Sequence, residues 1–165
     1  MPSKFQIEPQ QKLNWCWAAV TATVSRYFSP QSNISQCNIA QRVLKIDCSN
    51  PDSDRPARFE DALSVLNEIL PQPLNNKPLE QQSLPFETIQ SQIHSGRPVC
   101  ARIGWFNEDS GHLVMITGYS VSNSGEQWLD ISDPYYEDST VPYVDFKNAY
   151  LAAGEWTDTY LLGQP

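Results

Sequence analysis

The sequence predicts one α+β domain, with a helical layer first and an antiparallel β-sheet after it. Apolar residues recur at spacings of three and four in the first half of the chain, and they alternate or run together in the second half. The length of 165 residues is enough for one hydrophobic core and too short for two full domains. We therefore expect a single domain over 1–165, with a helical part over about 12–96, a sheet over about 97–165, and a cleft where the two parts meet.

Four helices are expected. The first covers 14–28, with Asn14 as its N-cap and Pro30 just beyond its end. The others are predicted, in order, over 35–44, 58–70 and 85–96. The polar, proline-rich segment 71–84 is expected to be a connecting loop.

The strand patterns follow. Residues 99–105 alternate between apolar and other side chains, and 112–120 is a nearly continuous apolar run, which is typical of a strand buried on both faces. Further strands are predicted over 127–136, 141–146 and 157–163, the last of which is expected to close the sheet.

The charge of the chain excludes two classes of partner. Eleven basic and 19 acidic residues give a net charge of −8, and no run of basic residues interrupts this acidity. We therefore expect no nucleic-acid partner and no anionic membrane partner. The sequence has no apolar stretch of about 20 residues, and its first residues lack the pattern of a secretion signal. This predicts either a cytosolic protein or one that is exported by another route.

The four cysteines predict neither a metal site nor a disulfide-rich scaffold. They form no CxxC pair, so we expect no metal site. Cys100 is expected to pack in the sheet. Cys37 and Cys48 are close enough in sequence for a disulfide, and the redox compartment decides between a bridge and two free thiols.

Cys16 is a candidate nucleophile because it falls in the first turn of the predicted helix 14–28. There the helix dipole and unpaired N–H groups favour a negative charge such as a thiolate. The alternative is a core cysteine packed between its two neighbouring tryptophans. Of the two histidines that could activate a thiol, His94 fits a helix C-terminus, whereas His112 begins the buried strand.

An imidazole that acts as a base is usually held by an oxygen on its far nitrogen. Asp133 is placed for this role if its strand neighbours the one that begins at His112, and Asp130 is the alternative. Acyl transfer also needs donors for the developing oxyanion. The backbone N–H of the nucleophile is one, and the side-chain amide of Gln10 or Gln11 is another.

Four segments, "QQKLNWCWAA", "GRPVCARIGW", "GHLVMITGY" and "WLDISDPY", together resemble the papain-like cysteine peptidases. The chain is most similar to the compact bacterial branch that includes plant-pathogen avirulence effector proteases, and it also resembles bacteriocin-leader peptidases. The resemblance implies a papain-like fold with Cys16 as nucleophile, His112 as base and Asp133 as orienting acid. Gln10 is preferred to Gln11 as oxyanion donor because it precedes the cysteine by six residues, as in papain.

The chain also departs from papain itself. Leu13, Asn14 and Trp15 replace its Cys-Gly-Ser, and aspartate replaces the orienting asparagine. The nucleophile and base are 112 − 16 = 96 positions apart, fewer than the roughly 130 to 150 of papain-like signatures. These departures favour the compact branch.

The implied activity is hydrolysis of peptide bonds in a protein or peptide substrate, through a thioester and without a cofactor. A transglutaminase or deamidase with the same triad is one alternative, and a catalytically silent binding domain with the peptidase fold is another. Trp17 and Tyr135 are candidates for the substrate groove, although both also fit a purely structural role.

Overall fold

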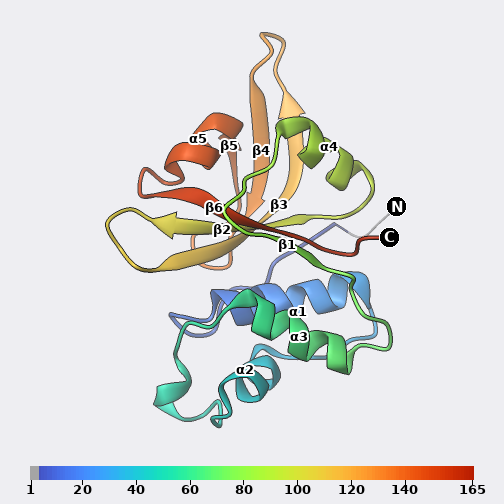
Figure 1. Ribbon diagram of the computed structural model, residues 1–165, viewed down its shortest axis with the longest axis vertical. Helices are drawn as coiled ribbons and strands as arrows, with labels where there is room; N and C mark the ends of the chain where they lie inside the picture. Colours follow the sequence, from blue (N-terminus) through green and yellow to red (C-terminus); the bar gives the residue numbers. More distant parts are fainter. Residues whose placement is uncertain (1–3) are drawn as a thin grey trace.

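The computed structural model describes residues 4–165 and contains helices on both faces of a sheet (Figure 1). In chain order the helices are α1 (Cys16–Phe28), α2 (Gln36–Leu44), the short 3-10 helix η1 (Pro51–Ser53), α3 (Phe59–Ile69), α4 (Phe86–His94) and α5 (Tyr143–Ala149). In the view of Figure 1, α1, α2 and α3 lie below the sheet, and α4 and α5 lie above it. Over residues 4–165, no helix combines the length and the apolar character that crossing a membrane requires.

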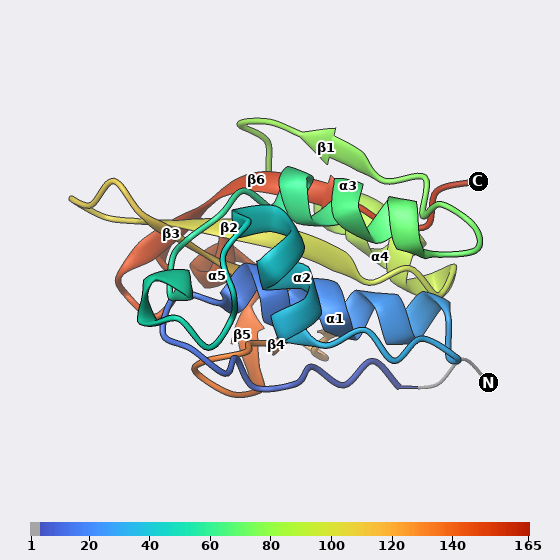
Figure 2. The same cartoon turned by 90° about the horizontal axis from the view of Figure 1, so that it is seen from below.

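The strands form one antiparallel sheet in the order β1-β6-β2-β3-β4-β5. Their bounds are β1 (Lys77–Leu79), β2 (Val99–Trp105), β3 (Gly111–Val121), β4 (Gln127–Ser132), β5 (Ser139–Pro142) and β6 (Gly154–Leu161). Figure 2 shows the helices α1, α2 and α3 in front of this sheet. The predicted α+β class, with a helical layer packed on an antiparallel sheet, is confirmed.

β3 is buried on both faces, as its continuous apolar run predicts. Leu113 and Met115 pack in the hydrophobic cluster that contains α1, α2 and α3. Val114 and Ile116 point the other way, into the cluster that contains α4 and α5. Because side chains alternate along a strand, burial on both faces requires apolar residues at successive positions.

α1 begins at Cys16, but the predicted N-cap is wrong. Trp15 occupies the N-cap position and makes no side-chain capping bond. Asn14 is held outside the helix because its N–H and its side-chain amide both donate to Asp54, at 2.8 and 3.3 Å. The first-turn N–H groups of α1 therefore have neither an intrahelical acceptor nor a side-chain cap.

The strand predicted over 141–146 is wrong in its second half, where α5 begins at Tyr143. Pro142 ends β5 because proline cannot donate a ladder hydrogen bond, and it stands at the N-cap of α5. Tyr143, Phe146 and Tyr150 recur at spacings of three and four, so they share one face of a helical turn. This helical spacing overrides the β propensity of the short apolar run.

The other corrections concern one edge of the sheet. The loop prediction for 71–84 is wrong at 77–79, which form β1. Pro78 is tolerated there because β1 is an edge strand that pairs with β6 alone. Of the strand predicted over 157–163, residues 157–161 belong to β6, which lies inside the sheet between β1 and β2 and does not close it.

A disulfide joins Cys37 of α2 to Cys48 in the following loop. A cross-link over a loop of this length stabilises a protein by about 2 to 3 kcal/mol, because it restricts the unfolded chain. Replacing both cysteines with serine is expected to lower the free energy of unfolding in urea by about this amount. A reductant should produce a similar loss in the wild type and none in the double variant. Equal stability of the two proteins without reductant would contradict a formed bridge.

Candidate active site

Cys16 is set in place by the tryptophans on either side of it. Both indoles are 1% exposed. The Nε1–H of Trp15 donates to the Ser53 carbonyl at 2.7 Å, and that of Trp17 donates to the Arg55 carbonyl at 3.0 Å. The two rings thereby fasten the start of α1 to the loop before α3, while the cysteine between them remains partly exposed. The tryptophans of the "WCW" triplet are core anchors, and the cysteine is not.

His112 lies near the beginning of β3 with its ring enclosed by aromatic side chains. The preceding residue, Gly111, lies close against β2, where a Cβ would lie 2.7 Å from the Ile103 carbonyl oxygen. The Trp105 ring stacks on the imidazole with centroids 5.8 Å apart, and the Tyr136 ring meets it edge-on, also at 5.8 Å. The imidazole is 7% exposed and has little freedom to turn.

The structure brings His112 together with Asp133 and Cys16. β4 ends with Ser132 opposite Met115 of β3, so Asp133 emerges next to the strand that carries the histidine. Its Oδ1 lies 2.7 Å from His112 Nε2. The Cys16 thiol is close enough to the same ring to raise the pKa of His112, and both residues line one cavity.

These contacts shift the pKa values of the buried pair. Burial alone would lower the pKa of His112, but the hydrogen bond that its ring donates to Asp133 and the neighbouring Cys16 outweigh burial and raise the pKa from 6.5 to about 9. Burial alone would raise the pKa of Asp133, but the hydrogen bonds that it accepts from His112, Tyr136 and Tyr150, together with the charge of His112, outweigh burial and leave the pKa lowered. The pair is therefore an imidazolium and a carboxylate at neutral pH.

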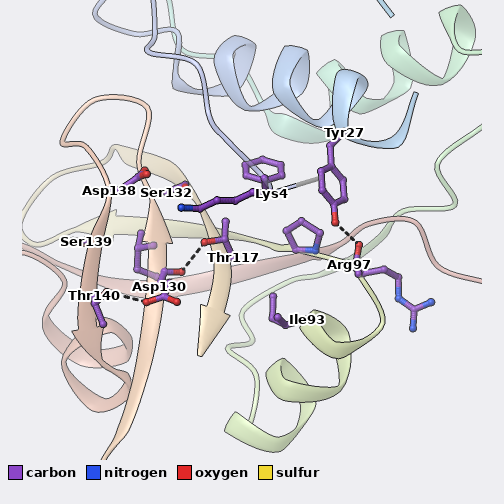
Figure 3. Close-up of a pocket in the computed structure, with 14 residues that line it drawn as sticks. Lys4, Tyr27, Ile93, Arg97, Thr117, Asp130, Ser132, Asp138, Ser139 and Thr140 are labelled. Carbon is purple, nitrogen blue, oxygen red and sulfur yellow. Dashed lines mark hydrogen bonds between the residues drawn. The ribbon is translucent and has the colours of Figure 1, made fainter. Parts of the chain in front are cut away.

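The alternative orienting residue, Asp130, lies elsewhere. Figure 3 shows Asp130 among the residues that line another cavity, beside β3, β4 and β5. This cavity has a volume of about 680 Å³, and its lining includes neither Cys16 nor His112. The Oδ1 of Asp130 accepts a hydrogen bond from the Thr140 hydroxyl at 2.8 Å, and the Asp130 backbone carbonyl accepts one from the Thr117 hydroxyl at 3.3 Å. Asp130 is thus engaged with its own neighbours and does not contact His112.

A cavity of about 590 Å³ opens onto Cys16 and His112 between the helical layer and the sheet. Trp17 lines it. Tyr135 does not: it is 50% exposed, and its ring packs against Tyr136 at 4.6 Å. Among the residues that the structure describes, no three His, Cys, Asp or Glu side chains gather as a metal site would require.

Comparison with known proteins agrees with this geometry. The model of the Peptidase C39-like family matches residues 2–158, which is nearly the whole chain. The chain belongs to the Peptidase C39-like family. A comparison with curated proteins gives no match.

Two of the solved structures similar to this Peptidase C39-like chain are plant proteases. One is the proform of the Amb a 11 cysteine protease, a major ragweed pollen allergen, with a TM-score of 0.58 and 11% identity over 97% of this chain. This chain spans 56% of the length of that protein. Another is the bromelain protease from Ananas comosus in complex with the E64 inhibitor, with a TM-score of 0.53 and 11% identity, covering 97% of this chain and 94% of that chain.

The predicted papain-like fold is confirmed by these likenesses, and the family model that matches is that of the Peptidase C39-like proteins. The narrower resemblance to bacterial effector proteases and bacteriocin-leader peptidases stays a prediction.

The two glutamines before the cysteine occupy different environments in the C39-like fold. The backbone N–H of Gln10 donates to the Pro134 carbonyl at 2.9 Å, and its side-chain amide donates to the Lys12 carbonyl at 3.0 Å. Gln11 is exposed, and its N–H donates to the Gln36 side chain at 2.9 Å. Gln10 is therefore tied to the residue after Asp133, whereas Gln11 is tied to α2.

Sequence reasoning missed Tyr150, which lies just after α5. Its hydroxyl donates to Asp133 Oδ2 at 2.6 Å, while the N–H groups of Tyr135 and Tyr136 donate to Oδ1 at 2.9 Å each. Tyr150 is 2% exposed, and burial together with the nearby carboxylate raises its pKa, so it remains a neutral donor. Its helical spacing with Phe146 indicates core packing, but no sequence signal links it to Asp133.

Replacing Tyr150 with phenylalanine is expected to lower kcat/KM for peptide hydrolysis about tenfold, because it removes a hydrogen bond to a buried charge. The ring and its packing are retained, so the free energy of unfolding should fall by only about 1 to 3 kcal/mol. The dependence of activity on pH, measured for the variant and the wild type, should also differ in the pH range where His112 titrates. A profile and rate identical to the wild type would show that this hydroxyl does not support Asp133.

Proposed function

We propose that this chain is a cysteine peptidase in which Cys16 attacks the peptide bond, His112 transfers protons and Asp133 holds the imidazole. One observation carries the proposal: the cysteine at the start of α1 shares an open cavity with an imidazole whose Nε2 is hydrogen-bonded to a buried carboxylate at 2.7 Å. A nucleophile, a base and an orienting group in this order are what acyl transfer requires.

In the acylation step the Cys16 thiolate attacks the carbonyl carbon, and a C–S bond forms. An adjacent imidazolium and a helix N-terminus both favour the thiolate form. The carbonyl oxygen becomes an oxyanion, which the backbone N–H of Cys16 stabilises because α1 offers no other acceptor for it. His112 then donates its proton to the departing amine, the C–N bond breaks, and a thioester remains.

In the deacylation step a water molecule attacks the thioester while His112 takes its proton. The tetrahedral intermediate collapses, the C–S bond breaks, and the Cys16 thiolate is restored beside a protonated imidazole. The carboxylic acid product leaves. Asp133 remains ionised throughout, since its role is to orient the ring and stabilise the imidazolium.

Gln10 is the better candidate for a second oxyanion donor. Its backbone bond to Pro134 anchors it beside the Asp133 segment, and its amide nitrogen, which donates to the Lys12 and Leu13 carbonyls, must turn away from them to reach an oxyanion. Gln11 is exposed, and its backbone N–H is bonded to the Gln36 side chain of α2. A Gln10→Ala variant should therefore lose more activity than Gln11→Ala.

The substrate in this proposal is a protein or peptide. The resemblance to effector proteases and bacteriocin-leader peptidases supports either a foreign protein or a precursor peptide as the natural target.

The test combines a covalent probe with a turnover assay. E64, the inhibitor present in the bromelain complex, should add to the wild type in intact-mass spectra and should not add to Cys16→Ala. A peptide library followed by mass spectrometry then identifies the reaction. Cleaved peptides support the peptidase, whereas conversion of glutamine to glutamate in intact peptides indicates a deamidase. A chain that neither reacts with E64 nor changes any peptide would be a silent binding domain.

A further inference from the structure

The cavity beside Cys16 has an acidic lining. It extends from Cys16 and His112 along the start of α3 toward β6, so a peptide cleaved at the cysteine would place the residues next to the scissile bond there. Apart from the Cys16 thiolate and the His112 imidazolium, whose charges offset each other, its charged lining residues are Arg58, Glu60, Glu80, Arg102, Asp109 and Asp158. Two positive and four negative charges give 2 − 4 = −2.

The two arginines are already matched by other carboxylates. Arg58 pairs with Asp61, which does not line the cavity, at 2.9 Å. Arg102 Nη1 lies 3.9 Å from Asp158 Oδ2. Within residues 4–165, Glu60, Glu80 and Asp109 form no ion pair, so the surplus negative charge of the lining resides on them.

Glu60 is the best placed of these three carboxylates. It is half-buried in the first turn of α3, and its Oε1 accepts the Tyr160 hydroxyl at 3.0 Å. Burial and this carboxylate raise the pKa of Tyr160. The second oxygen, Oε2, has no hydrogen-bond donor in the described part of the chain. Glu80 and Asp109 are exposed on loops.

Aromatic rings lie next to this carboxylate. Phe59 and Tyr160 meet edge to face with centroids 5.0 Å apart, and Trp17 also lines the cavity. A long cationic side chain can lay its methylene stem on such rings while its charged head meets a carboxylate. A neutral or acidic side chain would gain the apolar contact at most.

We propose that this cavity selects peptides that carry lysine or arginine next to the cleaved bond, and that Glu60 is the specificity-determining residue. The inference rests on the proposed peptidase function. It names a basic peptide segment as the substrate class, because a hydrogen-bonded ion pair with Glu60 Oε2 is available to that class alone.

The test uses two peptides that differ only in arginine or citrulline at the position beside the cleaved bond. Citrulline has nearly the same shape and no charge. The wild type should favour the arginine peptide about 10- to 100-fold in kcat/KM, the range for a hydrogen bond to a charged group. Glu60→Gln retains an oxygen for the Tyr160 hydroxyl and should lose most of this preference. Glu68→Gln, an exposed position on the same helix outside the cavity, should retain it.

A second readout separates this inference from the peptidase proposal. Cys16→Ala, which cannot turn over substrate, should bind the arginine peptide more tightly than the citrulline peptide, and adding Glu60→Gln should abolish the difference. Cleavage and E64 labelling without an arginine preference, or a preference that survives Glu60→Gln, would overturn the inference and leave the peptidase standing. An affinity that depends on arginine, without E64 labelling or cleavage, would overturn the peptidase proposal and leave Glu60 as the residue that recognises the basic side chain.

Discussion

Replacing Cys16 with alanine is expected to lower the rate of peptide hydrolysis by about 10⁴-fold or more, the scale on which loss of a covalent nucleophile acts. The cysteine is the first residue of α1, next to the imidazole and open to the cavity, so no other thiol can take its place. Hydrolysis of a fluorogenic peptide by the purified variants measures the loss, and circular dichroism verifies the fold.

Cys100 provides the matched control. It is fully buried in β2, and burial raises the pKa of its thiol well above the ordinary value, which keeps it unreactive. Cys100→Ala should therefore retain activity close to that of the wild type. Activity that survives in Cys16→Ala and disappears in Cys100→Ala would identify Cys100 of β2 as the nucleophile and refute the proposed mechanism.

The sequence predicts the elements that carry the site because their patterns are local. A cysteine at the start of a helical repeat, a histidine at the start of a doubly buried strand and an aspartate at the end of the next strand are each readable within about ten residues. The antiparallel neighbours β3 and β4 then bring His112 and Asp133 together, since consecutive strands usually pair. The choice of Asp133 over Asp130 depends on where β4 ends.

What the sequence does not reveal depends on contacts between distant segments. Tyr150 reaches Asp133 only because α5 packs over the sheet, and "VPYVDF" gives the wrong element for that segment. The strand β1 has only three residues, one of which is a proline, so its formation depends on pairing with β6. Glu60 enters the cavity beside Tyr160, one hundred positions away. Local periodicity carries no information about such pairs.

Replacing His112 with alanine is expected to slow alkylation of Cys16 by iodoacetamide at pH 6 about 100-fold, because an unassisted thiol is less than about 1% ionised there. The measurement is the rate of modification of each cysteine against pH, followed by peptide mass spectrometry. In the wild type, Cys16 should react fast at pH 6 while buried Cys100 stays inert. Equal rates in wild type and variant would show that the ring does not activate the thiol.

The same histidine gives a second, independent signature in folding stability, and its sign follows from the raised pKa. The folded protein holds the His112 proton up to about pH 9, whereas the unfolded chain releases it near the ordinary value of 6.5. The stability contributed by His112 is therefore fully present below about pH 6.5 and is lost as the pH rises to about 9.

Asp133, whose pKa is lowered, contributes in the opposite sense, and the stability that it contributes is lost as the pH falls below about 4. The free energy of unfolding, measured in urea, should thus fall between pH 6.5 and 9 by more in the wild type than in His112→Ala. The variant lacks the imidazole whose proton binding differs between the folded and unfolded states.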